Sequence, residues 1–161
     1  TGDVRPAWEQ ASAAVVDAIG AAWRDTPPRQ LLRLHGDCHL GNVLWRDGGP
    51  HVVDLDDACT GPAVQDLWML VSGDRRSITW QLSLLLEGYA QFSDFDEREL
   101  ALMEPLRSLR MLRYSAWLAE RWSDPAFPRA FPDFGTSAYW SQQVTQLREQ
   151  LETMAEPPLR V

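Results

Sequence analysis

Apolar residues recur at spacings of three and four over most of this chain, and only one short part departs from that pattern. The first such stretch runs from Pro6 to Trp23 and the last from Ala138 to Ala155. Spacings of this kind place apolar side chains on one face of an α-helix. Helices are likewise predicted over Pro62 to Val71, Ile78 to Phe92 and Leu106 to Trp122. The chain is therefore predicted to be mainly helical.

One part of the chain carries the clear strand signal. Val43 to Trp45 and His51 to Val53 are short β-prone runs on either side of the turn-forming sequence Asp47-Gly48-Gly49-Pro50. This is the pattern of a β-hairpin. A short extended run, Gln30 to Leu34, leads into the polar segment that precedes it. We therefore expect a helical body that carries one small hairpin.

Two local features refine the helical regions. Asp96 and Glu99 have the spacing of a capping box, in which the two side chains satisfy backbone groups at one helix start. Asp124 to Phe134 holds three prolines and three phenylalanines, and we interpret it as an ordered, packed loop.

Composition limits the function classes. Hydrophobic residues make up 45% of the 161 residues and the net charge is −8, so we expect a globular chain with no nucleic-acid or membrane partner. Two cysteines, Cys38 and Cys59, cannot form a disulfide framework, which favours the cytoplasm. All fifteen basic residues are arginine. A reaction that needs a lysine to bind a phosphate group therefore cannot be completed by this chain alone. The first residue is Thr1, and we expect the chain to be a piece of something longer.

The chemistry is concentrated between residues 35 and 66, a segment with six carboxylates, three histidines and one arginine. It opens with His35-Gly36-Asp37-Cys38-His39-Leu40-Gly41-Asn42, which reads H-x-D-x-x-x-x-N. A protein-kinase catalytic loop has this spacing: its Asp accepts the proton of the substrate hydroxyl, and its Asn holds magnesium. Asp54 follows the second strand of the hairpin, where a kinase carries another magnesium-binding Asp. We therefore predict Asp37 as the catalytic base and a magnesium site at Asn42 and Asp54, with Asp54 counted among the catalytic residues.

The same segment allows another interpretation. His35, Asp37, Cys38, His39 and Cys59 all belong to residue types that bind zinc. The two histidines are not on a helix, and no second His or Cys pair follows at a recognised spacing, so this alternative is disfavoured.

Three stretches carry a resemblance to a known family: Leu34 to Asn42, Asp54 to Leu70, and Glu104 to Pro132. They resemble the aminoglycoside phosphotransferase and choline kinase-like superfamily and, within it, the bacterial stress response kinase A family of Ser/Thr protein kinases. The loop motif is shared by the whole superfamily. Two further runs narrow the resemblance to the stress response kinase A family: Gly-Pro-x-x-x-Asp-Leu-Trp-Met-Leu and Asp-Pro-Ala-Phe-Pro. It extends from about Gln30 to Pro158.

The resemblance implies an ATP- and Mg²⁺-dependent phosphotransferase of the cytoplasm, with a role in stress response and with phosphorylated protein as its product. His35 and Asp66 would support the site, Asp66 by accepting hydrogen bonds from the backbone of the catalytic loop. Asp56 and Asp57 would shape the acceptor site or bind a second cation, and a solvated turn is an equal alternative. The implied fold is a mainly α, protein-kinase-like C-terminal lobe over residues 1–161.

Family members also have an N-terminal ATP-binding lobe with a lysine for the phosphates. We expect that lobe of the same protein to be the partner of this chain, and we expect the chain alone neither to bind ATP tightly nor to turn over. Gly36 occupies the place of the arginine that pairs with a phosphorylated activation loop in many kinases, and eleven residues separate Asp54 from Asp66. We therefore expect control by abundance or by the N-terminal lobe.

Three functions stay open. The first is a Ser/Thr protein kinase with a protein acceptor. The second is a kinase of a small molecule such as an aminoglycoside, choline or homoserine, for which an acidic pocket suits a cationic acceptor. The third is a catalytically silent binding domain with the shape of a kinase.

Overall fold

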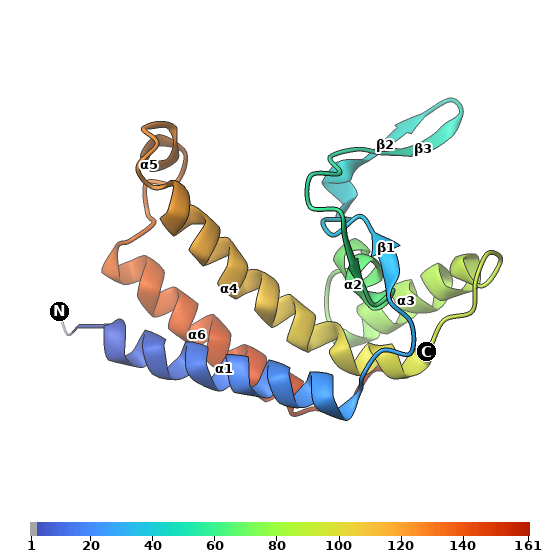
Figure 1. The fold of residues 1–161 in the computed structure, drawn as a ribbon, viewed down its shortest axis with the longest axis horizontal. Coiled ribbons are helices and arrows are strands. Elements are labelled where there is room, and N and C mark those ends of the chain that lie inside the picture. The colour runs from blue at the N-terminus through green and yellow to red at the C-terminus, as the bar shows by residue number, and fades with distance from the viewer. Residues whose placement is uncertain (1–2) are drawn as a thin grey trace. The chain divides into compact units, whose positions relative to one another are not determined.

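The computed structural model describes residues 3–161 and divides the chain into two compact units (Figure 1). The helical unit comprises Thr1–Asp25 and Glu104–Pro157. The site unit comprises Thr26–Met103 and Pro158–Val161. All residues that the sequence predicts for a functional site belong to the site unit.

The helical unit consists of long helices that pack through apolar stripes. Helix α1 (Arg5–Asp25) lies against α6 (Ser137–Met154), and side chains of α4 (Met103–Arg121) complete the core. Full burial of an aliphatic side chain contributes about 1.5–3 kcal/mol, so such a stripe is the main source of stability. The buried centre of this core is formed by Ala11, Val15, Val144 and Leu147.

Aromatic rings extend this core at one end of the helical unit. The rings of Trp8 and Trp140 lie 4.9 Å apart, and Phe134 contacts Trp122 and Trp140. The segment that contains Phe134 was predicted as a loop, and its packing is confirmed. That prediction missed the short helix α5 (Ala126–Ala130), which begins where the Asp124 carboxylate accepts a hydrogen bond from the N–H of Ala126.

The site unit contains two small antiparallel strand pairs. The predicted hairpin is confirmed as β2 (Val43–Arg46) and β3 (Gly49–Val52), with Val43 opposite Val52. The second pair is β1 (Leu32–Leu34) with β4 (Cys59–Gly61), in which Leu34 lies opposite Cys59. The sequence did not predict β4, because Cys-Thr-Gly shows neither alternation nor a β-prone run.

Short helices connect these strands to the rest of the site unit. The stretch predicted as one helix after Pro62 consists of one turn of α-helix and one 3₁₀ turn, because the chain tightens after Leu67. The helix that follows begins at Arg75, with the Asp74 carboxylate accepting from the N–H of Ser77 at 2.8 Å. The helical elements of the site unit are η1 (Leu40–Asn42), α2 (Val64–Leu67), η2 (Trp68–Leu70), α3 (Arg75–Tyr89) and η3 (Glu97–Leu102).

No helix within residues 3–161 has both the length and the apolar character needed to cross a membrane.

Candidate functional site

Residues 35–42 form the candidate catalytic loop, which connects β1 to β2. Its first residue, His35, is buried and makes two hydrogen bonds with its ring. Nε2 lies 2.8 Å from the carbonyl oxygen of Val53, and Nδ1 accepts from the N–H of Asp37 at 3.2 Å. Because the carbonyl can only accept, the ring carries its proton on Nε2. His35 thereby ties the loop to the end of the hairpin, next to Asp54.

Asp66 holds the start of the catalytic loop from helix α2. Its two carboxylate oxygens accept from the N–H groups of His35, at 2.8 Å, and Gly36, at 2.9 Å. Hydrogen bonds to a charged acceptor are stronger than neutral ones, and here two adjacent backbone groups share one carboxylate. Asp66 thus makes the contact that the resemblance implies for it, and it fixes the backbone that leads to Asp37.

Gly36 leaves no room for a side chain. Its φ is +86°, and a Cβ atom placed on it would lie 2.1 Å from the carbonyl oxygen of Asp57. The sulfur of Cys59 closes the same space at 3.3 Å. An arginine at this position, as in kinases that respond to activation-loop phosphorylation, is therefore sterically excluded.

Asn42 closes the catalytic loop on Asp37. It is buried, and its Nδ2 donates to the carbonyl oxygen of Asp37 at 3.0 Å. Since only the nitrogen can donate, this bond orients the amide and leaves the amide oxygen as the atom suited to a cation. The Asn42 carbonyl in turn accepts from the N–H of Val53 at 3.0 Å.

The hairpin brings Asn42 and Asp54 together. Asn42 precedes β2 directly, and Asp54 follows the Val53 that is hydrogen-bonded to Asn42. Asp54 has a φ of +66°, the only positive φ at a non-glycine position within residues 3–161. Backbone strain of this kind costs about 1–3 kcal/mol and is found mainly at functional sites.

The donor set fits a hard divalent cation. Asn42 offers an amide oxygen and Asp54 a carboxylate, and magnesium takes few protein ligands when phosphate oxygens and water supply the others. Within residues 3–161, His, Cys, Asp and Glu side chains form no group of three suited to a metal ion. The zinc interpretation is weakened further because both ring nitrogens of His35 are engaged in hydrogen bonds with the chain.

Asp56 and Asp57 lie near this loop, and Cys38 is part of it. Asp56 and Asp57 are exposed on a turn closed by the hydrogen bond from the N–H of Ala58 to the carbonyl of Leu55. The pKa of the Cys38 thiol is raised by burial and then by the negative charges of Asp66 and Asp37. Cys38 is therefore held as a neutral thiol, which is a poor nucleophile and metal ligand.

Glu99 contributes to the site in a way that sequence reasoning missed. Its carboxylate accepts from the N–H of Val64 at 3.1 Å, so it caps α2, the helix that carries Asp66. The predicted capping box is therefore wrong: Asp96 caps η3 through the N–H of Arg98, whereas Glu99 turns away to α2. Burial raises the pKa of the Glu99 carboxyl. No local signal could reveal this contact, because it joins residues 35 positions apart.

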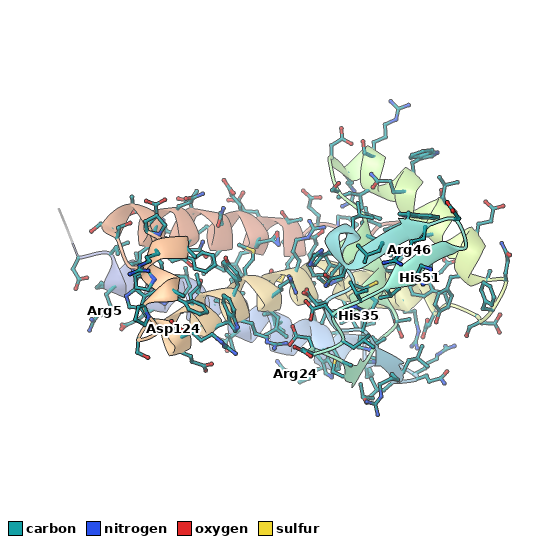
Figure 2. The ribbon with its side chains drawn as sticks, turned by 90° about the horizontal axis from the view of Figure 1, so that it is seen from above. Arg5, Arg24, His35, Arg46, His51 and Asp124 are labelled. Atoms are coloured by element: carbon teal, nitrogen blue, oxygen red, sulfur yellow. The ribbon has the colours of Figure 1, made fainter. Side chains whose placement is uncertain are left out.

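His39 shapes the loop as the cap of η1: its Nδ1 accepts from the N–H of Gly41 at 3.0 Å. What the sequence did not indicate is its second contact, since its Nε2 lies 3.6 Å from Oδ2 of Asp37. The other histidine of the segment, His51, is an exposed residue of the hairpin (Figure 2).

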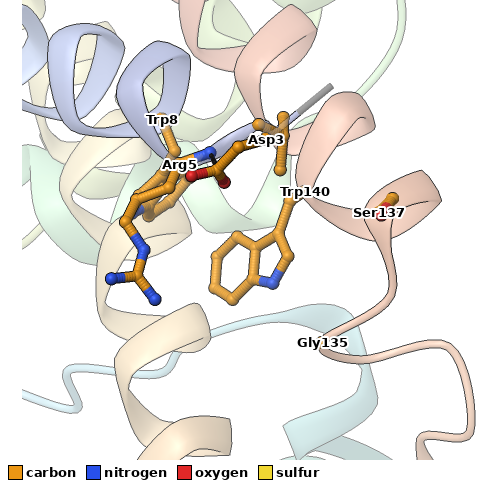
Figure 3. Close-up of a pocket in the computed structure, with 7 residues that line it drawn as sticks. Asp3, Arg5, Trp8, Gly135, Ser137 and Trp140 are labelled. Carbon is orange, nitrogen blue, oxygen red and sulfur yellow. Dashed lines mark hydrogen bonds between the residues drawn. The ribbon is translucent and has the colours of Figure 1, made fainter. Parts of the chain in front are cut away.

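A separate pocket of about 420 Å³ lies in the helical unit, between the start of α1 and the start of α6 (Figure 3). Arg5, Trp8 and Trp140 are among the residues that line it. None of the residues predicted for the functional site borders this pocket.

The class of protein that these features define is the kinase-like phosphotransferases. The features are a loop with H-x-D-x-x-x-x-N spacing, a short hairpin and a strand-end Asp, all within a helical chain. The chain belongs to the phosphotransferase enzyme family, whose family model matches residues 2–106. It is 49% identical to stress response kinase A of Escherichia coli strain K12 over 98% of its own length. It is 48% identical to the serine/threonine protein kinase RdoA of Salmonella typhimurium, also over 98% of its length. The resemblance drawn from the motifs is thus confirmed.

The chain spans 47% of the length of both of these relatives. Among solved structures it is similar to the amicoumacin kinase hAmiN in complex with AMP-PNP, Ca²⁺ and Ami, with a TM-score of 0.58 and 20% sequence identity. That likeness covers 92% of this chain and 46% of the kinase chain. It confirms the predicted fold class, a mainly α chain of the kinase-like type.

Proposed function

We propose that the protein containing this chain is an ATP- and Mg²⁺-dependent Ser/Thr protein kinase, and that this chain is its C-terminal lobe. The observation that carries the proposal is the bonding of the catalytic loop. Asp66 and His35 anchor the loop through hydrogen bonds, and Asn42 is hydrogen-bonded to Asp37. Asp54 lies beside Asn42. The identity to stress response kinase A and to a named serine/threonine protein kinase supports a protein acceptor.

In this mechanism Asp37 accepts the proton of a Ser or Thr hydroxyl while the oxygen of that hydroxyl bonds to the γ-phosphorus and the bond to ADP breaks. Asn42 and Asp54 would hold magnesium, which would supply positive charge to offset the negative charge of the ATP phosphates. His35 and Asp66 keep the backbone of the loop in place. Asp56 and Asp57, exposed beside the loop, would contact a basic acceptor segment.

We also propose that the N-terminal lobe of the same protein is the principal partner of the chain. The chain contains no lysine, so the lysine with which kinases bind the ATP phosphates would come from another part of the protein. For the same reason the chain on its own is expected neither to bind ATP tightly nor to transfer phosphate. We place the protein in the cytoplasm, without a nucleic-acid or membrane partner.

A small-molecule kinase is the second candidate. It is favoured by the likeness to a structure described as an amicoumacin kinase and by the six carboxylates between residues 35 and 66, which suit a cationic acceptor. A silent binding domain is the weakest candidate, because Asp37, Asn42 and Asp54 are all present.

The deciding experiment follows labelled phosphate in the full-length protein. Wild type and Asp37→Asn are incubated with Mg²⁺ and γ-labelled ATP, with and without a generic protein acceptor. We expect acid-stable label on Ser or Thr, reduced about 10²- to 10⁴-fold in Asp37→Asn because the base is lost. Asp47→Asn, an exposed carboxylate on the hairpin turn, is the matched control and should label like wild type.

Absence of protein label together with ATP consumption that rises with cationic metabolites would assign the protein to the small-molecule kinases. Equal labelling by Asp37→Asn and wild type would overturn the assignment of the base. No ATP consumption under any of these conditions would favour the silent binding domain.

A further inference from the structure

His39 lies two residues after the proposed base, and the mechanism above does not use it. Its Nδ1 accepts a hydrogen bond from the N–H of Gly41 at 3.0 Å. An acceptor nitrogen carries no proton, so the neutral ring has its proton on Nε2. The cap that shapes η1 therefore also determines which ring nitrogen is a donor.

That donor nitrogen is the one that faces the base. Nε2 lies 3.6 Å from Oδ2 of Asp37. The side chain of Asp37 is 18% exposed and that of His39 is 42% exposed. The carboxylate is thus mostly enclosed, while the ring is the more exposed of the two side chains. A positively polarised N–H at this distance attracts the carboxylate oxygen and disfavours other rotamers of Asp37.

Gly41 shows that the loop is shaped around this ring. A Cβ on Gly41 would lie 2.7 Å from Cε1 of His39 and 2.9 Å from Nδ1. Gly41 is not among the glycines with positive φ, so its backbone does not itself require glycine. The space that the missing side chain leaves is occupied by the imidazole. Position 41 therefore accommodates the ring in the orientation that reaches Asp37.

We propose that His39 is a positioning residue for the proposed base, holding the Asp37 carboxylate through Nε2–H in the orientation that receives the hydroxyl proton. This inference rests on the proposed function of Asp37. In this tautomer Nε2 already carries a proton, so His39 orients the carboxylate and does not take the substrate proton from it. The competing interpretation is that His39 acts only as the cap of η1.

Two substitutions separate these roles, because each keeps one of the two ring functions. His39→Asn places an acceptor oxygen near the position of Nδ1, so it keeps the cap and removes the contact with Asp37. His39→Gln places its amide nitrogen near the position of Nε2, so it keeps a donor toward Asp37. Gly41→Ala retains His39 but displaces its ring.

We expect His39→Asn and Gly41→Ala in the full-length protein to lower kcat about tenfold with little change in KM for ATP, less than loss of the base itself. His39→Gln should retain most of the wild-type kcat. His51→Asn, an exposed histidine on β3, is the control and should match wild type. A wild-type kcat for His39→Asn, or equal losses in the Asn and Gln variants, would overturn the proposal.

A second readout does not depend on activity. In protein labelled with ¹⁵N-histidine, NMR of the His39 ring should show the Nε2–H tautomer, and its Nε2 resonance should shift in Asp37→Asn. An Nδ1–H tautomer, or a resonance unaffected by Asp37→Asn, would overturn the proposal. Absence of phosphate transfer by wild type would instead contradict the proposed function, while the NMR result would still report whether the two side chains interact.

Discussion

The helical unit and the catalytic loop of this protein are held by different interactions. In the helical unit the central contacts are apolar, between side chains such as Val15 of α1 and Leu147 of α6, both fully buried. In the catalytic loop of the site unit the central contacts are polar, between side chains and backbone groups. Asp66 binds two loop N–H groups, and His35 and Asn42 bind the chain at both ends of the loop.

This difference matters because the two kinds of contact respond differently to substitution. An apolar core tolerates small displacements, and its stabilisation grows with the area buried. A hydrogen bond from a buried backbone group depends on one partner, and the loss of that partner leaves the group unsatisfied. The helical unit is therefore suited to stability, and the catalytic loop to a defined position of a few atoms.

The largest effect on stability is expected in the helical unit. Leu147→Ala should lower the free energy of local unfolding of α1 and α6 by about 3 kcal/mol, because it leaves a cavity in a fully packed core. Hydrogen exchange of the full-length protein, followed by mass spectrometry, would measure this loss. Arg148→Ala, the exposed neighbour on α6, is the control. An effect below about 1 kcal/mol would show that the apolar stripe does not dominate.

A smaller loss is expected for Asp66→Ala, about 2 kcal/mol, because the N–H groups of His35 and Gly36 lose their charged acceptor. The same exchange experiment should show faster exchange confined to residues 35–42, with α1 and α6 unchanged. Phosphate transfer by the Asp66→Ala protein should also fall. Faster exchange in both units, or in neither, would contradict the division drawn above.

The smallest effect concerns Glu99 and depends on pH. Burial raises the pKa of its carboxyl above the ordinary 4.5. A carboxyl with a raised pKa in the folded state favours folding while protonated, and this contribution is lost as pH rises from below 4.5 through the folded pKa. Glu99→Gln cannot titrate, so its stability relative to wild type should increase between about pH 4 and pH 7.

Melting temperatures of the wild type and Glu99→Gln, measured across that range, would test this expectation. The other carboxyls are present in both proteins, and Asp96, with a pKa lowered to about 2 by its hydrogen bonds with Arg98, stays ionised across this range. They therefore cancel in the difference. If the curves of melting temperature against pH run parallel for the two proteins, Glu99 has an ordinary pKa.

The long helices and the hairpin could be predicted because their signals are local. Helices α1 and α6 follow apolar spacings of three and four, and the hairpin follows two β-prone runs around Asp47-Gly48. The strand β4 and the helix α5 could not be predicted in this way. β4 becomes a strand only by pairing with β1, and α5 is one turn that begins at a carboxylate within a proline-rich segment.

The candidate site was predictable as a set of residues, because Asp37, Asn42 and Asp54 lie within eighteen consecutive positions and their spacing matches a known motif. The supporting contacts were not. The bond from the N–H of Val64 to Glu99 joins distant parts of the chain, and the contact between His39 and Asp37 depends on a ring orientation that spacing does not specify.

By itself the sequence determined the helical character, the hairpin and the set of candidate site residues, because periodicity and motif spacing are properties of neighbouring residues. The tertiary structure decided which side chains hold those candidate residues in place. Gly36 must be glycine because the backbone of Asp57 passes behind it, whereas a side chain at Gly41 would displace the ring of His39. Such requirements arise only when segments distant in sequence, or side chains with several rotamers, are packed against each other.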